Sequence, residues 1–231
     1  MAQAPTSGPV DAERSRTLWF AVLLTLTNGF LDAHTYIARG HVFANVQTAN
    51  VIFSAIHVSE RQFSSALAHV WPLLAFIAGM LLASHIKSGR MEQMLPYSLR
   101  WTIGVQAVVL AIIGFVPASV DHTFVTVPIS FLAAVQIGLF RNIGDLAYLP
   151  VATTGNLMRF MESVYDGAVE KRAEARRPTA VYGILILAFA SGALAGALAT
   201  DAWSVHAIWL PAGFLAVTLC LFIIDEREWM R

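Results

Sequence analysis

The chain has 231 residues, of which 57% are hydrophobic and 13% charged, and its 15 basic residues balance its 15 acidic residues. A water-soluble domain of this length carries more charge on its surface, so the composition argues against a soluble enzyme and favours a protein whose solvent is the lipid bilayer. The balanced charge excludes a surface that attracts nucleic acid, and the single cysteine excludes a disulfide framework.

Six apolar runs are long enough to cross a membrane, because a helix needs about 20 residues to span the hydrocarbon core. We expect a disordered cytoplasmic tail over residues 1–17. The predicted spans follow at residues 18–38, 67–86, 101–120, 124–146, 180–200 and 206–224, before a short cytoplasmic tail at 226–231. The predicted fold class is an all-α, polytopic helical membrane protein.

Two shorter stretches, residues 42–58 and 149–164, carry several Asn, Gln and Thr side chains. Each of them either crosses the membrane or enters it and returns. If both return, the chain has six spans and most of its Lys and Arg residues face the cytoplasm, as the positive-inside rule requires. If both cross, there are eight spans and this bias weakens. The sequence therefore favours six spans with both termini in the cytoplasm, and eight spans remain the alternative.

Similar short segments indicate an internal repeat. Gln47-Thr48-Ala49-Asn50 resembles Thr153-Thr154-Gly155-Asn156, and residues 74–79 (LAFIAG) resemble residues 187–192 (LAFASG), in the same order. We expect two repeat units, at residues 18–120 and 121–225. With three spans in each unit the second copy is inverted, whereas with four it is parallel. Each polar stretch is then an interrupted or re-entrant helix, and many secondary transporters build their binding site from such helices.

Several motifs lie in a fixed order along the chain: Gly29-Phe30-Leu31-Asp32-Ala33, Gly40-His41-Val42-Phe43, Thr48-Ala49-Asn50, Gln136-Ile137-Gly138 and Thr154-Gly155-Asn156. In these motifs the chain resembles the YoaK-like family of uncharacterised bacterial inner-membrane proteins, over residues 18–224. The resemblance implies a six-span, multi-pass protein of the bacterial inner membrane and supplies no substrate. Ala49 stands where the motif has glycine, and alanine would be strained there if the backbone were left-handed.

Asp32 is the leading candidate for a functional residue, because an ionisable side chain inside a membrane segment costs several kcal/mol unless it is paired or hydrated. It is a candidate proton or cation site, or else a hydrated residue near the outer end of the first span. The full candidate site for a substrate or ion comprises Asp32, Gln47, Thr48, Asn50, Gln136, Thr154, Gly155, Asn156 and Arg159. Alternatively, these polar groups only hold helices together. Arg159 pairs with Glu162, with Asp32 or with an anionic substrate.

These observations favour a small transporter or permease-like protein with a polar site near the middle of the membrane. The alternative is a membrane protein that transports nothing and serves as a scaffold or as an assembly partner. A channel is a third interpretation. The sequence contains no G-x-S-x-G, H-E-x-x-H or glycine-rich phosphate motif, so we expect no enzyme, no catalytic residue, no metal and no cofactor. The expected partners are the lipid bilayer, a small solute or ion, and a second copy of the chain, which would pack through Gly192 and Gly196.

Overall fold

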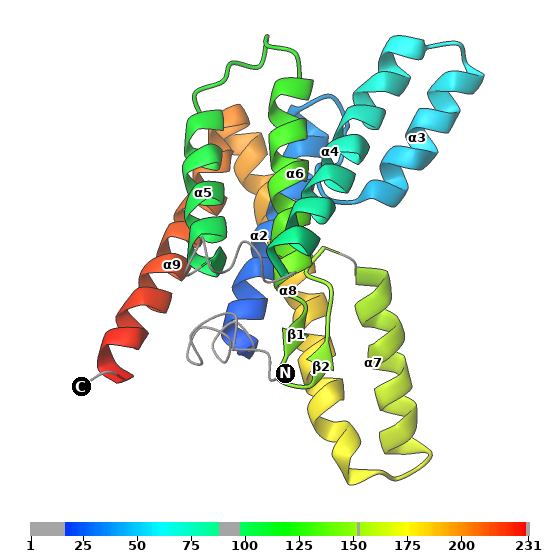
Figure 1. Ribbon diagram of the computed structural model, residues 1–231. Coiled ribbons are helices and arrows are strands. Elements are labelled where there is room, and N and C mark those ends of the chain that lie inside the picture. The colour runs from blue at the N-terminus through cyan, green and yellow to red at the C-terminus, as the bar shows by residue number, and fades with distance from the viewer. Residues whose placement is uncertain (1–16, 88–97, 152, 230–231) are drawn as a thin grey trace.

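A computed structural model describes residues 17–87, 98–151 and 153–229, which are helical apart from connections and one short hairpin. The first half contains α2 (Leu18–Ala38), α3 (Gln47–Ser59), α4 (Phe63–Lys87) and α5 (Ser98–Ile113). The second half contains α6 (Thr123–Leu139), β1 (Asn142–Ile143), β2 (Leu146–Ala147), α7 (Thr153–Ala168), η1 (Ala173–Ala175), α8 (Arg176–Trp203), η2 (Ser204–Ile208) and α9 (Trp209–Trp229) (Figure 1). The predicted all-α class is confirmed for these residues.

The helices of the two halves pack against each other in matching pairs. α2 lies along α8, α4 lies along α6, and α5 lies along α9. Within each half, α3 packs on α4 and α7 packs on α8, while α2 also touches α9 and α5 touches α6. Exchanging α2 with α6, α3 with α7, α4 with α8 and α5 with α9 leaves this set of helix contacts unchanged.

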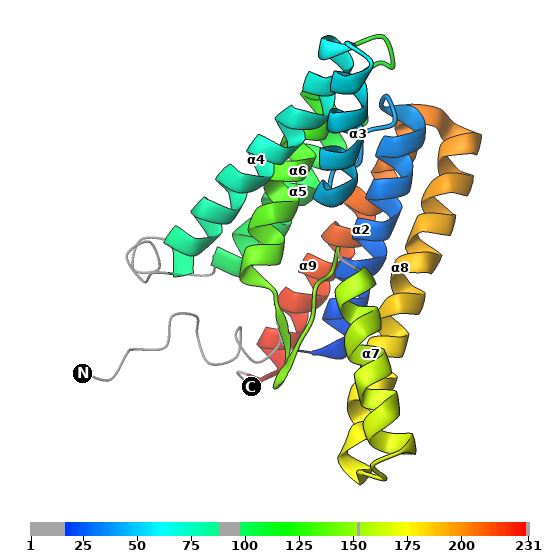
Figure 2. The same cartoon turned by 90° about the vertical axis from the view of Figure 1, so that its right-hand side faces the viewer.

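The helices exchanged in this way run in opposite directions. In Figure 1, α2, α3, α5 and α8 run upward from their N-terminal ends, whereas α4, α6, α7 and α9 run downward. Figure 2 shows the same directions from the side for α2, α4, α7 and α8. α3 and α7 both begin near the middle of the molecule's height, and each then runs to the end from which α4 or α8 returns.

Glycines allow α2 and α8 to approach closely. A Cβ atom at Gly192 would collide with the main-chain carbonyl of Leu26, and one at Gly196 would collide with that of Phe30. Both glycines are buried in this contact. This small-residue face therefore packs inside one chain, and the homo-oligomer contact predicted through Gly192 and Gly196 is wrong for this face.

Some predicted spans end too late. The third predicted span reaches residue 120, but α5 ends at Ile113, before the turn that contains Pro117. The fourth reaches residue 146, but α6 ends at Leu139 and β1 and β2 follow. Gly144 in their two-residue turn has a φ of 61°, a conformation that favours glycine and suits a tight hairpin. The sequence did not reveal the hairpin, because residues 124–146 are mostly hydrophobic and are predicted as one continuous span.

Two stretches of the described chain are long and apolar enough to cross a membrane, Phe63–Lys87 and Ala173–Leu221, and the second includes η1, α8, η2 and α9 as far as Leu221. In the most apolar part of each, only 28% and 33% of the residues are buried. Most of these apolar side chains therefore face outward, where lipid would surround them. α2 is also long, but it carries buried polar residues, and these define the candidate site.

Candidate functional site

One face of α2 carries polar side chains that are buried inside the helix bundle. Thr25, Asn28 and Asp32 follow each other at spacings of three and four residues, which places them on one side of the helix. None of the three is more than 3% exposed. Because hydrocarbon surrounds a membrane span, a buried polar row of this kind needs partners from other parts of the chain.

The chain after α2 turns back into the bundle and supplies the first of these partners. Gly40 has a φ of 73°, which helps the chain reverse its direction. The main-chain N–H of Asn45 donates to Asp32 Oδ1 at 3.0 Å, and Asn45 Nδ2 donates to the Asn28 carbonyl at 3.3 Å. α3 begins at Gln47, so the Asp32 carboxylate lies at the N-terminal end of this helix, where the helix dipole favours a negative charge.

Three amide side chains connect α2, α6 and α5 beside this turn. Asn28 Nδ2 donates to Gln136 Oε1 at 2.8 Å, and Gln136 Nε2 donates to Gln106 Oε1 at 2.7 Å. All three side chains are completely buried. We call the five residues that these bonds join the polar cluster: Asn28, Asp32, Asn45, Gln106 and Gln136.

Polar contacts also fix the first turn of α3 between α4 and α6. Gln47 Nε2 donates to Ser130 Oγ at 2.9 Å, and Ser130 Oγ donates to the Pro72 carbonyl at 2.7 Å. Asn50 Nδ2 donates to Gln47 Oε1 at 3.1 Å, and Asn50 Oδ1 lies 3.2 Å from His69 Nδ1. Side-chain hydrogen bonds to α4 and α6 therefore hold the N-terminal end of α3 in place.

An open cavity of about 830 Å³ lies at the end of the bundle where α2 ends and α4 begins. Four histidines contribute to its wall, His41, His57, His69 and His122, and no Lys or Arg among the described residues lines it. His69 belongs both to the cavity wall and to the contact with Asn50. The cavity thus reaches the side chains that hold the start of α3.

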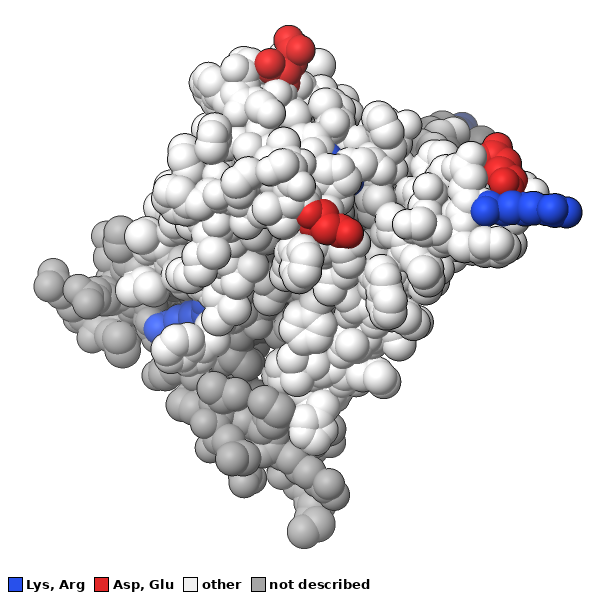
Figure 3. Space-filling view, turned by 90° about the horizontal axis from the view of Figure 1, so that it is seen from above, with Lys and Arg blue, Asp and Glu red and all other residues white. Residues whose placement is uncertain are grey.

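Two carboxylates lie on the wall of this cavity, Glu60 and Asp121. The main-chain N–H of Thr123 donates to Asp121 Oδ1 at 2.8 Å, and this bond holds the pKa of that carboxyl below its usual range. Asp121 is therefore negatively charged at neutral pH. Seen from above, this end of the molecule shows few charged side chains on a mostly uncharged surface (Figure 3).

Four buried atoms of the polar cluster have no hydrogen-bond partner among the described residues. They are Asn28 Oδ1, Asp32 Oδ2, Asn45 Oδ1 and Gln106 Nε2. Leaving a buried polar atom without a partner costs about 1–3 kcal/mol, so such atoms are rare in folded proteins. Four of them in one cluster make it the candidate site for water, an ion or a polar solute.

The equivalent polar stretch of the second half makes a different environment. Asn156 Nδ2 donates to the Leu149 carbonyl at 2.8 Å, and the Leu149 N–H donates to Asn156 Oδ1 at 3.2 Å. The side chain is therefore satisfied by the main chain. Thr154 is exposed, and its counterpart Thr48 in the first half is exposed as well.

The glycine of the Thr-Gly-Asn motif, Gly155, does not have a left-handed backbone. Gly155 lies inside α7 and Ala49 lies inside α3, and neither has a positive φ. A Cβ at Gly155 would meet Leu149 Cδ1 at 3.5 Å, which is an ordinary contact. Alanine at position 49 therefore brings none of the strain that a left-handed loop would have caused.

Arg159 lies far from the polar cluster. It lines a separate hollow of about 420 Å³ together with Tyr182, near the start of α8. Asp32 lies beyond Phe30, which packs on Gly196 much further along that helix. Tyr182 and Gly196 are about 21 Å apart on a helix that rises 1.5 Å per residue. The suggested pair between Arg159 and Asp32 is therefore wrong.

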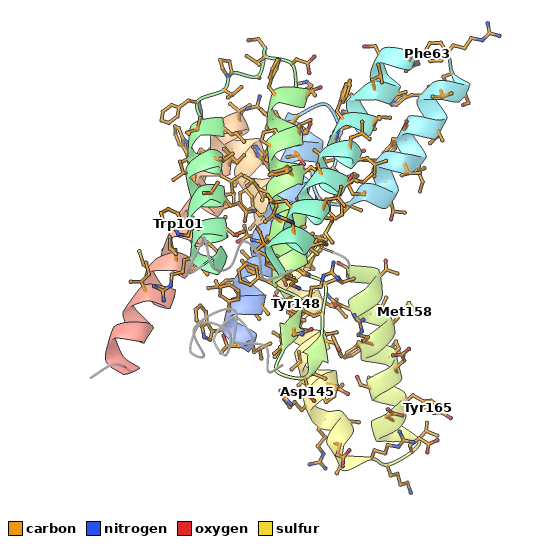
Figure 4. The ribbon with its side chains drawn as sticks, in the orientation of Figure 1. Phe63, Trp101, Asp145, Tyr148, Met158 and Tyr165 are labelled. Atoms are coloured by element: carbon orange, nitrogen blue, oxygen red, sulfur yellow. The ribbon has the colours of Figure 1, made fainter. Side chains whose placement is uncertain are left out.

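α7 exposes large side chains on the side that faces away from α8. Figure 4 shows Met158 and Tyr165 on the outer side of α7, pointing away from α8. They are 61% and 56% exposed.

Asp145, in the hairpin turn, accepts a hydrogen bond from Arg177 Nη1 at 2.8 Å and ties the hairpin to the start of α8. These contacts are peripheral, so they shape the lower end of the molecule in Figure 1 rather than the polar cluster.

The structure thus divides the predicted site residues into two groups. Asp32 and Gln136 belong to the polar cluster, and Gln47 and Asn50 hold the adjacent start of α3. Thr48 is in the same turn of α3 but its side chain is exposed, and the other predicted residues are in α7: Thr154, Gly155, Asn156 and Arg159. Sequence reasoning missed Asn28, Asn45 and Gln106. Asn28 could have been found, since it precedes Asp32 by one helical turn. In the described part of the chain no three His, Cys, Asp or Glu side chains group as metal ligands.

Comparisons with known proteins found a family match and a transmembrane relative. Residues 20–221 match a family described as "Protein of unknown function (DUF1275)". The chain is 24% identical over 195 residues to the UPF0700 transmembrane protein YoaK of Bacillus subtilis (strain 168), and the alignment covers 82% of this chain and 86% of that protein. No solved structure matches the chain. The polar cluster lies entirely within the matched residues.

Proposed function

This chain belongs to the DUF1275 family, whose function is unknown, and from that premise we propose that it is a six-span transporter of a small polar solute. It is a membrane protein, as its transmembrane relative indicates. In the proposed mechanism the solute crosses between the two halves of the bundle and binds at the polar cluster. The observation that carries the proposal is that cluster, a buried polar site with unpartnered atoms beside a helix that starts inside the bundle.

The arrangement of the helix ends supports six spans with both termini in the cytoplasm. The start of α2, the start of α8 and the end of α9 lie toward the lower side in Figure 1, and α4 ends and α5 begins at the ends of these helices that point to the same side. The segments next to these ends contain most of the Lys and Arg residues of the chain. Under the positive-inside rule that side faces the cytoplasm, in our proposal that of a bacterial inner membrane.

In this proposal α3 and α7 are the short arms of two re-entrant segments. Each begins inside the bundle and leaves on the side that the preceding long helix, α2 or α6, has just reached, so neither crosses the membrane. The opposite directions of equivalent helices then make the second half an inverted copy of the first. Inverted halves with interrupted helices are the framework in which alternating access occurs in many secondary transporters.

The cavity supports an outward-facing entrance. It opens at the end opposite the basic segments, and His69 in its wall contacts Asn50 at the start of α3. A movement of the α3–α4 pair relative to α2 and α6 would connect the cavity to the polar cluster. We assign no catalytic role to any residue, because the proposed chemistry consists of binding and release.

Transport is tested by reconstituting the full chain in proteoliposomes and measuring uptake of a panel of labelled polar solutes. We expect saturable uptake of at least one compound class. Gln136→Leu removes two hydrogen bonds of the polar cluster without adding a charge, and we expect it to lower that uptake at least tenfold while the protein stays folded. Thr48→Ala is the matched control, because Thr48 is exposed and outside the cluster.

The same experiment separates a transporter from a scaffold. A scaffold would give no uptake above empty liposomes for any compound, and Gln136→Leu would change only stability or oligomeric state. Uptake that resists Gln136→Leu would also contradict the proposal, since the solute would then pass elsewhere.

A further inference from the structure

The polar cluster contains three oxygen atoms that accept no hydrogen bond from the described part of the chain. Asn28 Oδ1, Asp32 Oδ2 and Asn45 Oδ1 are all buried and without a partner among the described residues. Their side chains belong together: Asn45 bonds to both Asn28 and Asp32, which are one helical turn apart on α2. One carboxylate oxygen and two amide oxygens without partners thus belong to three residues that hydrogen bonds join, and none of the three residues is more than 3% exposed.

Among the described residues, no cationic side chain pairs with Asp32. None of the ion pairs between described residues involves Asp32. The buried Arg39 is the nearest cationic side chain along α2, but its guanidinium is used elsewhere. It donates to the Val116 carbonyl at 2.7 Å and to the Pro117 carbonyl at 3.0 Å. A buried, ionised carboxylate without a counter-charge costs free energy, and a cation bound from solution would offset this cost.

We propose that Asn28, Asp32 and Asn45 bind one sodium-sized monovalent cation, which serves as the coupling ion of the transporter. This inference rests on the proposed function for the role of the ion, although binding itself does not require transport. Hard cations prefer carboxylate and carbonyl oxygens, and all three unpartnered oxygens are of these types. A single carboxylate matches a charge of one rather than two.

A bound proton satisfies these atoms less well than a metal ion. Protonated Asp32 can donate one hydrogen bond and would leave the oxygen of Asn28 or of Asn45 still without a partner. A cation accepts several oxygen ligands at once. Close packing around the cluster favours a small ion, since its side chains are almost completely enclosed.

The test measures binding of ²²Na⁺ to the purified full-length protein in detergent, at constant ionic strength set with choline chloride. We expect saturable binding of about one ion per chain, displaced by unlabelled Na⁺ and not by choline. Na⁺ should also raise the unfolding temperature, because it binds the folded state alone. No saturable ²²Na⁺ binding by the folded wild-type protein would overturn the proposal.

Two variants locate the ion. Asp32→Asn removes the charge and keeps the shape, and we expect it to abolish binding and the rise in unfolding temperature. Asp201→Asn makes the same change at an exposed carboxyl of α8 and should bind Na⁺ like the wild type. If Asp32→Asn does not fold, Asn28→Ala provides a second test and should weaken binding at least tenfold. Equal binding by the wild type and the folded Asp32 or Asn28 variant would contradict the site.

The outcomes also separate this inference from the proposed transport. Na⁺ binding at Asp32 without any solute uptake would leave the ion site standing and overturn the transporter. Solute uptake without Na⁺ binding would support the transporter and overturn the ion site. If the unfolding temperature depends on pH through Asp32 but not on Na⁺, the site binds a proton and the sodium proposal is wrong.

Discussion

Asn50 and Asn156 make the same hydrogen bond in the two halves of the molecule. Asn50 Nδ2 donates to the Phe43 carbonyl at 2.6 Å, and Asn156 Nδ2 donates to the Leu149 carbonyl at 2.8 Å, in each case seven residues upstream. Each bond closes the connection that leads into a short polar helix. These asparagines therefore act on the backbone, which explains their place in the repeated motif without a ligand.

Replacing either asparagine should destabilise the protein. In Asn50→Ala or Asn156→Ala a main-chain carbonyl loses its side-chain donor, at a cost of about 1–3 kcal/mol. The measurement is thermal unfolding of each purified variant in detergent. Thr48→Ala and Thr154→Ala are the controls, and we expect changes within about 0.5 kcal/mol because both threonines are exposed. Equal losses from the threonine and asparagine variants would contradict this role.

Gly192→Ala should loosen the contact between α2 and α8. Its new Cβ would collide with the Leu26 carbonyl, which belongs to a helix backbone and cannot move alone. We expect a loss of about 1–3 kcal/mol, as for overpacked cores. Gly213→Ala is a matched control on α9, where nothing lies within 4 Å of the new Cβ. Thermal unfolding of both variants checks this, and equal stability of the two would show that α2 and α8 are not packed so closely.

Single cysteines test the membrane topology. In a Cys220→Ser background, Glu60→Cys, Arg90→Cys and Ala173→Cys are placed one at a time and labelled on intact cells with a membrane-impermeant thiol reagent. Six spans with re-entrant segments predict labelling at position 60 and protection at 90 and 173. With eight spans position 90 would be labelled and positions 60 and 173 would be protected. This result would contradict the proposal that the second half is an inverted copy of the first.

The Asp145–Arg177 pair should affect titration more than stability. The main-chain N–H of Asp145 and then the hydrogen bond from Arg177 hold the pKa of Asp145 below its usual range. A lowered pKa in the folded state stabilises the protein above the ordinary Asp pKa, about 3.9, and this contribution is lost as the pH falls through the lower value. Both side chains are exposed, so we expect the unfolding temperature of Arg177→Gln to match the wild type at neutral pH. Carboxyl-carbon NMR titration should show the pKa of Asp145 rising in that variant, and an unchanged pKa would refute the pairing.

Part of the site was visible in the sequence and part was not. Asp32 stood out because it interrupts an apolar run, and Gln136 because it belongs to a motif of the resembling family, and both belong to the polar cluster. Arg159 stood out as a charged residue in the second polar stretch but lies far from them, since polarity along a chain says nothing about distance in space. Asn45 could not have been found in this way, because it reaches Asp32 only after the chain reverses at Gly40.

The sequence by itself determined the helical membrane class, the order of the helices and the two polar stretches. It could do so because hydrophobicity and length are local properties, and a bilayer accepts only backbone whose hydrogen bonds are closed locally. Only the tertiary structure decided that α3 starts inside the bundle, that Gly192 packs against α2 rather than a second chain, and which polar side chains meet. Those features depend on contacts between residues far apart in the chain, which the pattern of one helix does not contain.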